Sequence, residues 1–376
     1  MRFVLLELNL KKIIIHPGFH KTGTTALQQA LTEARAEMRR ASFHYPHIAG
    51  NAHHRAAWAI IEKTWGWKNR GGTLMEPIEW EKLLKRVKSN ENTSIISSEF
   101  FSQANPTQIA NLAQGLKGLD VQIIFTWRPL PFMLASSYQQ YLKYGIEVSY
   151  SDWLDSIFQV HGESKLTPSF WQRNLHGDVV ARWAETFGAE SVSLISVDDS
   201  NPNFLYDSFA GLAGIPSGIL KEPLKREMNR SLTFNEASLL LEINRTYPKD
   251  RNWNSYELFV RRGNIRALTG TDKYEISDEK IMTPDWAIAK AAELNSQSVE
   301  QIKSLGIKVV GNLESSDFSK IPSGLNSPVT TISIESAARA MIGIDMSLLQ
   351  KMHRNDISQE YFRRLKKVIK RRLHLK

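Results

Sequence analysis

Residues 16–25, HPGFHKTGTT, combine the residue types that bind a phosphate or a similar anion. An isoleucine run, 13–15, precedes them and the helix-like sequence ALQQAL follows, which gives the order strand, glycine loop, helix. Glycine permits positive φ angles and a close approach of the backbone to a ligand. The first turn of the following helix directs free N–H groups and the positive end of its dipole at an anion. Lys21 adds a mobile charge, so the sequence predicts an anion-binding loop.

The lysine of this loop is not where an ATP-binding loop has it. In G-x-x-x-x-G-K-[ST] the lysine directly follows the second glycine and reaches the β- and γ-phosphates. Gly18 and Gly23 have the same separation, but Thr24 follows Gly23 and Lys21 precedes it by two positions. This spacing favours a nucleotide with one phosphate at the loop and a transferable group beside Lys21. It disfavours ATP and its metal ion.

A second candidate anion site follows the apolar run 121–126. Arg128 stands at the carboxyl end of this expected parallel strand, which is the edge where α/β proteins bind ligands. Ser136 comes eight positions later, on a helix that Pro131 can begin. Alone, the pattern also fits a solvated arginine at a helix start.

Together the two motifs resemble those of the sulfotransferases, which use 3′-phosphoadenosine 5′-phosphosulfate. The segment GFHKTGTT is similar to their 5′-phosphosulfate loop, and Arg128 with Ser136 is similar to their 3′-phosphate motif. The resemblance implies that Lys21 stabilises the bridging oxygen of the leaving phosphate and that no metal is needed. It implies nucleotide contacts by His20, Lys21, Thr22, Gly23, Thr24, Thr25, Arg128, Ser136, Arg226 and Arg230.

The basic segment 225–232, KREMNRSL, leaves two interpretations open. It resembles a segment of microbial sulfotransferases, in which case Lys225, Arg226 or Arg230 covers the nucleotide. Alternatively it is a capping stretch, in which Ser231 or Thr233 caps the helix that begins at residue 234.

An acceptor hydroxyl needs a base to take its proton. Glu99 is the first candidate because it follows the strand 94–98 and emerges at the same sheet edge as the loop. Related carbohydrate-directed enzymes have a glutamate at a similar place. His54, and after it His53, are the rival candidates from the histidine-rich segment 43–54, while His20 is expected to orient the loop. A metal site is not predicted.

The family's glutamate pattern implies a glycan or glycolipid hydroxyl as acceptor, with a small alcohol, a phenol or a protein tyrosine as alternatives. Tryptophan faces can stack on sugars, although most tryptophans belong to cores. The tryptophans in the segments expected around the acceptor are Trp58, Trp65, Trp67, Trp153 and Trp171.

Short β-branched runs at 13–15, 94–97, 121–126, 191–196 and 307–310 alternate with helix-like segments. The alternation predicts an α/β fold, a central parallel β-sheet flanked by helices, with a helical C-terminal extension. Helices are expected at 26–40, 80–88, 108–115, 131–144, 179–187, 234–245 and 286–304. We divide the chain into an α/β domain 1–314, a linker 315–331 and a basic helical tail 332–376.

The net charge of +9 resides mainly in the tail. Residues 363–376 carry eight Lys or Arg, and without them the net charge is +1, so nucleic acid is not an expected partner. The tail suits either packing on the domain, which we favour, or an anionic membrane surface.

No run of 18 apolar residues is present, so no membrane-spanning helix is predicted. Residues 1–10 are interpreted as a strand or an extension, and the lack of Cys fits a cytoplasmic location. A P-loop kinase and a non-enzymatic anion- or membrane-binding module are the competing functions.

Overall fold

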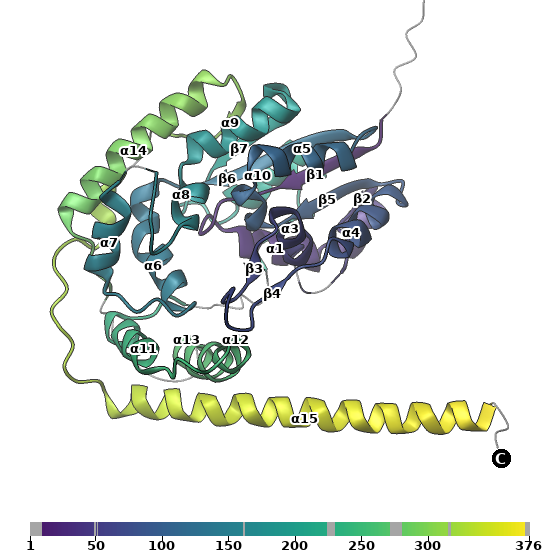
Figure 1. Cartoon of the computed structure of the whole chain (residues 1–376). Coiled ribbons are helices and arrows are strands. Elements are labelled where there is room, and N and C mark those ends of the chain that lie inside the picture. Colours follow the sequence, from purple (N-terminus) through teal and green to yellow (C-terminus); the bar gives the residue numbers. More distant parts are fainter. Residues whose placement is uncertain are drawn as a thin grey trace, which may run out of the picture.

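A six-stranded parallel sheet forms the centre of the molecule (Figure 1). The structure is a computed structural model, which describes residues 10–48, 50, 52–160, 162–223, 230–270, 280–314 and 317–372. The strands follow the order β2-β5-β1-β6-β7-β8 across the sheet. They are β1 (Lys12–His16), β2 (Phe43–His44), β5 (Thr93–Ser97), β6 (Asp120–Trp127), β7 (Val192–Ser196) and β8 (Lys308–Val310). The predicted α/β class is confirmed.

Alternation along the strands distributes apolar side chains to both faces of the sheet. Ile13 and Ile15 of β1 belong to one core, whereas Ile14 between them belongs to the other. The first core is covered by α3 (His54–Ile61), α4 (Ile78–Lys88), α5 (Pro106–Gly115), α9 (His176–Phe187) and α14 (Asp285–Ser304). The second is covered by α1 (Thr24–Glu33), α2 (Arg35–Arg40) and α10 (Phe204–Ala213).

The strand order reverses beside β1. From β1 the chain continues to β5 on one side, in register Ile13 to Ser94, and then crosses to β6 on the other side. In open parallel sheets, ligands bind at the carboxyl ends of the strands where the order reverses. The loop that follows β1 therefore occupies the position at which this fold binds ligands.

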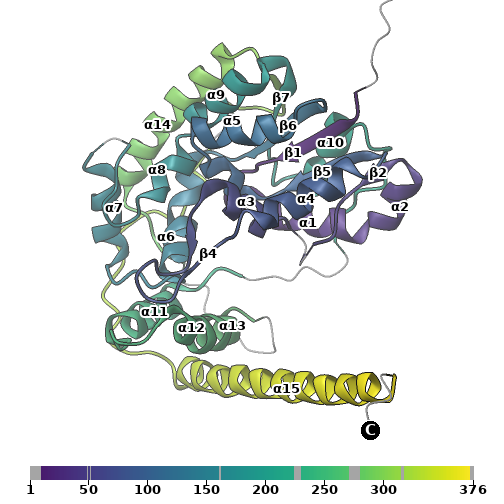
Figure 2. The same ribbon diagram turned by 45° about the vertical axis from the view of Figure 1, so that its right-hand side comes forward.

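A third apolar core joins a set of helices at the side of the sheet (Figure 2). We call this set the helical module. Trp153 and Trp171 are fully buried in it, so they do not form an acceptor wall, whereas Trp58, Trp65 and Trp67 are partly exposed. The module comprises α6 (Leu134–Leu142), α7 (Tyr150–Phe158), α8 (Ser169–Asn174), α11 (Phe234–Thr246), α12 (Trp253–Tyr256), the π-helix η4 (Glu257–Ile265) and α13 (Arg266–Thr269).

The tail is one long helix, α15 (Ile334–Arg372). Its first part packs on the helical module, where Arg339 donates to the carbonyls of Ala267 and Leu268 and Gly343 lies against Gly263. In both Figure 1 and Figure 2 its far half lies apart from the other labelled elements. The first part of the tail is therefore packed on the module, and the choice between packing and a membrane surface for its basic part stays a prediction. The structure does not describe the side chains of the apolar face that the sequence predicts for the tail. These are Ile357, Tyr361, Leu365, Val368 and Ile369.

Several elements differ from the sequence expectation. The single helix expected at 26–40 is two helices, which meet at Ala34. The pair β3 (Thr64–Trp65) and β4 (Thr73–Leu74), the two-residue β2 and the π-helix were not predicted. The expected strand at 1–10 lies almost wholly outside the described residues. Within the described ranges, none of the helices has the length and apolar character needed to cross a membrane.

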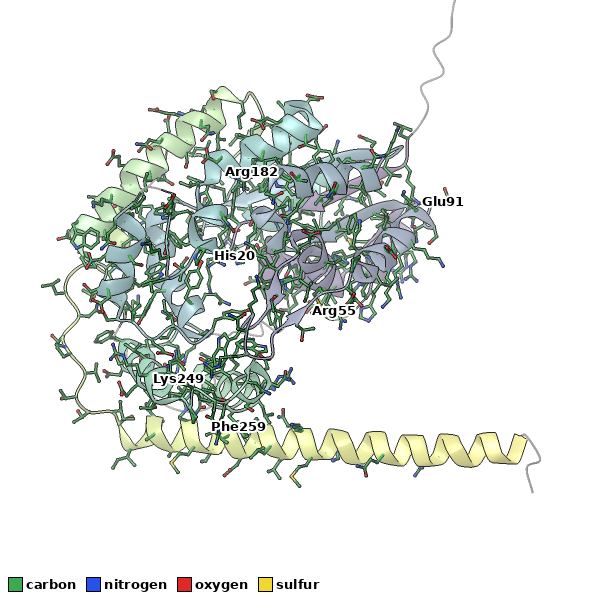
Figure 3. All side chains as sticks on the ribbon, in the orientation of Figure 1. His20, Arg55, Glu91, Arg182, Lys249 and Phe259 are labelled. Atoms are coloured by element: carbon green, nitrogen blue, oxygen red, sulfur yellow. The ribbon has the colours of Figure 1, made fainter. Side chains whose placement is uncertain are left out.

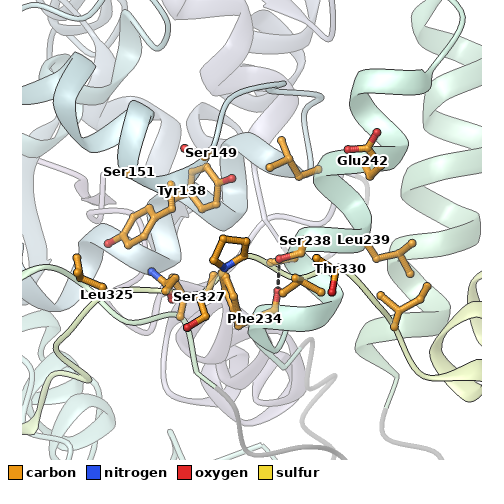
Figure 4. Close-up of a pocket in the computed structure, with 18 of the residues that line it drawn as sticks. Tyr138, Ser149, Ser151, Phe234, Ser238, Leu239, Glu242, Leu325, Ser327 and Thr330 are labelled. Atoms are coloured by element: carbon orange, nitrogen blue, oxygen red, sulfur yellow. Dashed lines mark hydrogen bonds between the residues drawn. The ribbon is translucent and has the colours of Figure 1, made fainter.

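The linker lies against the helical module instead of spanning open space. Asn326 exchanges two hydrogen bonds with the backbone of Met282, and the amide of Thr283 donates to the carbonyl of Pro322. A pocket of about 680 Å³ lies between this segment, α7 and α11, lined by Tyr138, Phe234 and residues 325–332 among others (Figure 4). None of the predicted site residues lines it.

Candidate active site

The loop after β1 has the backbone of a ligand cradle. Gly18 and Gly23 adopt positive φ angles of 54° and 83°, and Lys21 does the same at 66°. A Cβ on Gly18 would lie 2.9 Å from the Thr24 hydroxyl, so only glycine fits there. A positive φ is uncommon for a lysine and occurs mainly where the surroundings enforce it, as in functional loops. The predicted loop has the strained geometry that an anion site requires.

Two threonines of the loop use their hydroxyls inside the protein. Thr22 and Thr24 are buried and donate to the carbonyl of Phe19 at 2.7 and 3.1 Å. Thr22 Oγ1 also lies 2.7 Å from Thr126 Oγ1, and the amide of Phe19 donates to the Thr126 carbonyl. These hydroxyls hold the loop against β6, which leaves their backbone N–H groups as the contacts available to a ligand.

The N-terminus of α1 is free to receive an anion. Gly23 is its N-cap, no side chain caps it, and no acidic residue lies in its first turn. The N–H groups of such a first turn lack partners within the helix, and the helix dipole favours a negative charge there. Thr25 is exposed on this turn, and Lys21 is exposed just before it.

A buried polar network fixes the carboxyl ends of three strands. His16 lies 2.8 Å from Ser97 Oγ of β5 and 3.2 Å from Thr126 Oγ1 of β6. Burial lowers the pKa of His16 to about 3, so the ring is neutral and can bridge the two strands. Gln28 of α1 donates to Ser97 Oγ at 3.1 Å. The network connects β1, β5, β6 and α1 directly beneath the loop.

Glu99 lies at the end of β5 beside this network. Its Oε2 is 3.4 Å from Gln28 Nε2 and 3.7 Å from His54 Nδ1, and the same His54 nitrogen lies 2.9 Å from Ser98 Oγ. The side chains of Glu99 and His54 are 18% and 40% exposed, so a substrate can reach both. Burial and Arg173 lower the pKa of Lys21, and the Glu99 carboxylate partly opposes this lowering. Gln28, which orients Glu99, was not predicted, because a glutamine within a helix gives no signal.

His53 and His20 are held within the protein. His53 Nδ1 accepts from the amide of Ser97 and Nε2 donates to the Pro46 carbonyl, and burial lowers its pKa to about 4. With both nitrogens committed, His53 is not available as a base. His20 lies 3.2 Å from Gln103 Nε2 at the centre of the molecule (Figure 3), and its pKa is lowered by burial and by Arg173.

Arg128 emerges at the same sheet edge, on the other side of the loop from Glu99. It follows Thr126, which contacts the loop, by two residues, so its Cα lies within about 7 Å of the Thr126 Cα. The guanidinium pairs with Asp199, which follows β7 and is 73% exposed. Its Nε is buried without a partner. Ser136 donates to the Met133 carbonyl at 3.0 Å in the first turn of α6.

Arg230 has a different environment from the one expected. It binds both oxygens of Glu236, at 2.6 and 2.7 Å, and donates to the Leu268 carbonyl. Glu236 and Thr233 form the capping box of α11, which confirms the capping interpretation of this segment. The guanidinium is occupied by the fold, so the geometry gives no support to a nucleotide contact. Arg226 lies outside the described residues.

Three further cations, which the sequence did not single out, surround Lys21. Arg173 of α8 is 6% exposed, has no hydrogen-bond partner for its Nε, and lies over the ring of Tyr141 at 4.8 Å. Burial, and after it Arg173, lowers the pKa of Lys63 to about 8. The same two causes lower the pKa of Lys21. Burial and Lys21 lower the pKa of Lys143 to about 8. Lys63 also donates to Gln172, the neighbour of Arg173, and to Gln103, which contacts His20 next to Lys21.

The functional side chains therefore follow the strand order along one edge of the sheet. Glu99 and His54 lie at β5, Lys21 lies at β1, and Arg128 lies at β6 with Asp199 at β7. Neighbouring parallel strands are about 4.8 Å apart. A bound nucleotide at β1 and β6 would leave the β5 side of Lys21 open to a second substrate. In the part of the chain that the structure describes, no three His, Asp or Glu side chains are grouped to hold a metal.

No family model matches the chain, and no curated protein matches its sequence. Solved structures are similar to it, among them these two. One is a sulfotransferase from Alicyclobacillus acidocaldarius, 16% identical with a TM-score of 0.41 over 66% of this chain and 98% of that one. The other is the sulfotransferase domain from the curacin biosynthetic pathway, 9% identical with a TM-score of 0.35 over 80% of this chain and 99% of that one. Similarity this low carries no weight for activity, which must be inferred from the site.

Proposed function

We propose that the protein transfers a sulfuryl group from 3′-phosphoadenosine 5′-phosphosulfate to an acceptor hydroxyl. One observation carries the proposal: an uncapped helix N-terminus with Lys21, a separate arginine and a carboxylate follow one another along a single sheet edge. The donor has two anionic ends, a 5′-phosphosulfate and a 3′-phosphate. The loop and α1 suit the first, and Arg128 with the first turn of α6 suits the second.

The residues of the chain would act as follows. Glu99 accepts the proton of the acceptor hydroxyl while the oxygen forms its bond to sulfur. The bond between sulfur and the bridging oxygen breaks, and its electron pair stays on the phosphate of adenosine 3′,5′-bisphosphate. Lys21 stabilises the charge that develops on this oxygen, a contribution worth roughly 10²–10³ in rate. Gln28 donates to Glu99 and orients the carboxylate.

The competing functions fit the site less well. A kinase of the P-loop type needs a lysine directly after the second glycine, where Thr24 stands. A non-enzymatic anion-binding module does not need a partly exposed carboxylate, here 18% exposed, beside the cation that binds the anion.

His54 is the alternative base, because it lies beside Glu99 and is the more exposed of the two.

The acceptor is proposed to be a glycan or glycolipid hydroxyl. Phe100 lies next to Glu99, and its ring contacts those of His54, Trp58 and Trp65 at 5.1, 4.9 and 6.3 Å. Partly exposed aromatic rings beside the expected base can stack on a sugar.

Calorimetry with adenosine 3′,5′-bisphosphate, in the absence of magnesium, tests the nucleotide assignment. Micromolar binding is expected, and a preference for ATP with magnesium would instead favour the kinase. Lys21→Ala should lower turnover by roughly 10²–10³ while changing bisphosphate affinity less, because the lysine acts mainly in the transition state. Lys117→Ala, an exposed lysine at the amino end of β6, is the matched control. Full turnover in Lys21→Ala would refute the leaving-group role.

A further inference from the structure

The site holds three cations beyond Lys21 and Arg128, the two that the proposed function assigns to the nucleotide. Lys21 and Arg128 already face the two anionic ends of the proposed donor. Arg173, Lys63 and Lys143 add three cations around Lys21. Burying a guanidinium away from water is costly unless a charge or hydrogen bonds compensate it. A set of cations in this position therefore points to another anion.

Arg173 is the most informative of the three. It is 6% exposed, its Nε has no partner, and no acidic side chain among the described residues pairs with it. The contrast with Arg230 is direct, because the side chain of Arg230 is 13% exposed and binds Glu236 through two hydrogen bonds. The only stacking partner of Arg173 within the described residues is Tyr141. Its charge is thus available to a ligand.

The position of the extra cations separates them from the nucleotide. Lys63 donates to Gln103 Oε1 at 3.4 Å and to Gln172 Oε1 at 2.5 Å, and Gln103 in turn contacts His20. These residues lie on the β5 side of the loop. Lys143 follows α6, about 10 Å along the helix from Ser136, which is the end expected at the 3′-phosphate. Lys63 and Arg173, the neighbour of Gln172, therefore lie toward the proposed acceptor side, and Lys143 lies away from the proposed 3′-phosphate end.

We infer that the acceptor is itself acidic, and that Arg173, Lys63 and Lys143 bind a carboxylate, sulfate or phosphate group next to the hydroxyl that receives the sulfuryl group. The inference rests on the proposed function and narrows its substrate to an acidic saccharide. The guanidinium of Arg173 suits two oxygens of such a group, and the two lysines provide point charges around it. The product would carry two neighbouring anionic groups.

Paired saccharide probes test this inference on the full chain saturated with adenosine 3′,5′-bisphosphate at pH 7. The probes are methyl β-glucoside, methyl β-glucuronide and glucose 6-phosphate, and the measurement is the Kd of each. At least one acidic probe should bind about tenfold tighter than the glucoside, the gain expected of a charge-assisted hydrogen bond. The glucuronide and phosphate arms identify which anionic group is preferred. Equal affinity for acidic and neutral probes would overturn the inference.

Variants assign the effect to the cations. Arg173→Gln should abolish the preference for the acidic probe while leaving bisphosphate affinity unchanged. Because a change at a buried position can unfold the chain, Lys143→Gln provides a second test at a partly exposed position, and Lys117→Gln is the control. If Arg173→Gln weakens bisphosphate binding as much as acidic-probe binding, the guanidinium serves the donor and the inference fails. If the unmodified protein does not bind the bisphosphate, the proposed function fails instead.

Discussion

The arginines on the two sides of Lys21 differ in burial and in whether an acidic side chain pairs with them. On the β6 side, Arg128 is paired with the exposed carboxylate of Asp199. On the β5 side, Arg173 is buried, and no acidic group in the described part of the chain pairs with it. An exposed ion pair is weak and exchanges its partner at little cost, whereas a buried unpaired cation is costly and gains much from a ligand. On the proposed nucleotide side, Asp199 therefore occupies the Arg128 guanidinium until a ligand replaces it. On the proposed acceptor side, the Arg173 guanidinium has no such partner among the described residues.

The largest expected effect concerns the acceptor side. Glu99→Gln should lower turnover by about 10²–10⁴, because the amide keeps the shape of the side chain but cannot take a proton. Bisphosphate affinity should be unchanged, since Glu99 lies at β5 and the nucleotide at β1 and β6. Steady-state transfer assays with calorimetry on the same samples separate the two quantities. Retained turnover would pass the role of base to His54, and Glu79→Gln, an acid of α4, is a control for a general loss of charge.

The next effect concerns the nucleotide side. Arg128→Ala should weaken binding of adenosine 3′,5′-bisphosphate by roughly 10–100-fold, the value of a hydrogen-bonded charge pair. Binding of adenosine 5′-phosphate, which lacks the 3′-phosphate, should change little. Calorimetry with both nucleotides makes the comparison within one variant. An equal loss of affinity for the two nucleotides would show that Arg128 supports the fold of the sheet edge and does not bind the 3′-phosphate.

The titration of two lysines near Lys21 gives a third, smaller effect. Lys63 and Lys143 have pKa values lowered to about 8, so both are charged at pH 7 and lose their charge as the pH rises through 8. The charges facing them are those of Arg173 for Lys63, and of Lys21, Arg261 and Arg230 for Lys143.

Affinity for an acidic probe should therefore fall about tenfold between pH 7 and pH 9, while affinity for the neutral glucoside stays constant. A bound anion raises the pKa of a neighbouring lysine, so the fall should begin above pH 8 in the complex. Calorimetry at each pH measures this fall. A flat profile would mean that neither lysine contributes charge to the acceptor side.

More residues of the proposed nucleotide side than of the proposed acceptor side could be named from the sequence, for a physical reason. Residues 16–25 are contiguous, and Arg128 and Glu99 each follow a strand, so the parallel sheet alone brings them together. Arg173 and Lys143 come from helices of the module, and Lys63 comes from the loop after α3. Their meeting depends on how the module packs against the sheet, which no local pattern records.

The fold shows the same division. Strands β1, β5 and β6 were predicted because their runs are apolar and bounded, whereas β2 has two residues and is too short for any periodicity. The π-helix η4 has no distinctive sequence pattern. Arg230 was assigned to the nucleotide from a resemblance, and its bidentate pairing with Glu236 depends on the contact between α11 and α13.

The smallest effect tests the masking of Arg128. If Asp199 competes with the 3′-phosphate for the guanidinium, Asp199→Asn should tighten bisphosphate binding by up to about fivefold, because an exposed pair is worth no more than about 1 kcal/mol. The gain should shrink in high salt, since salt screens the pair that the variant removes. Glu190→Gln, an exposed acid at the amino end of β7, controls for the change in net charge. Calorimetry at low and high salt measures both values. Weaker binding in Asp199→Asn would reverse the interpretation, because the carboxylate would then be orienting Arg128 for the nucleotide.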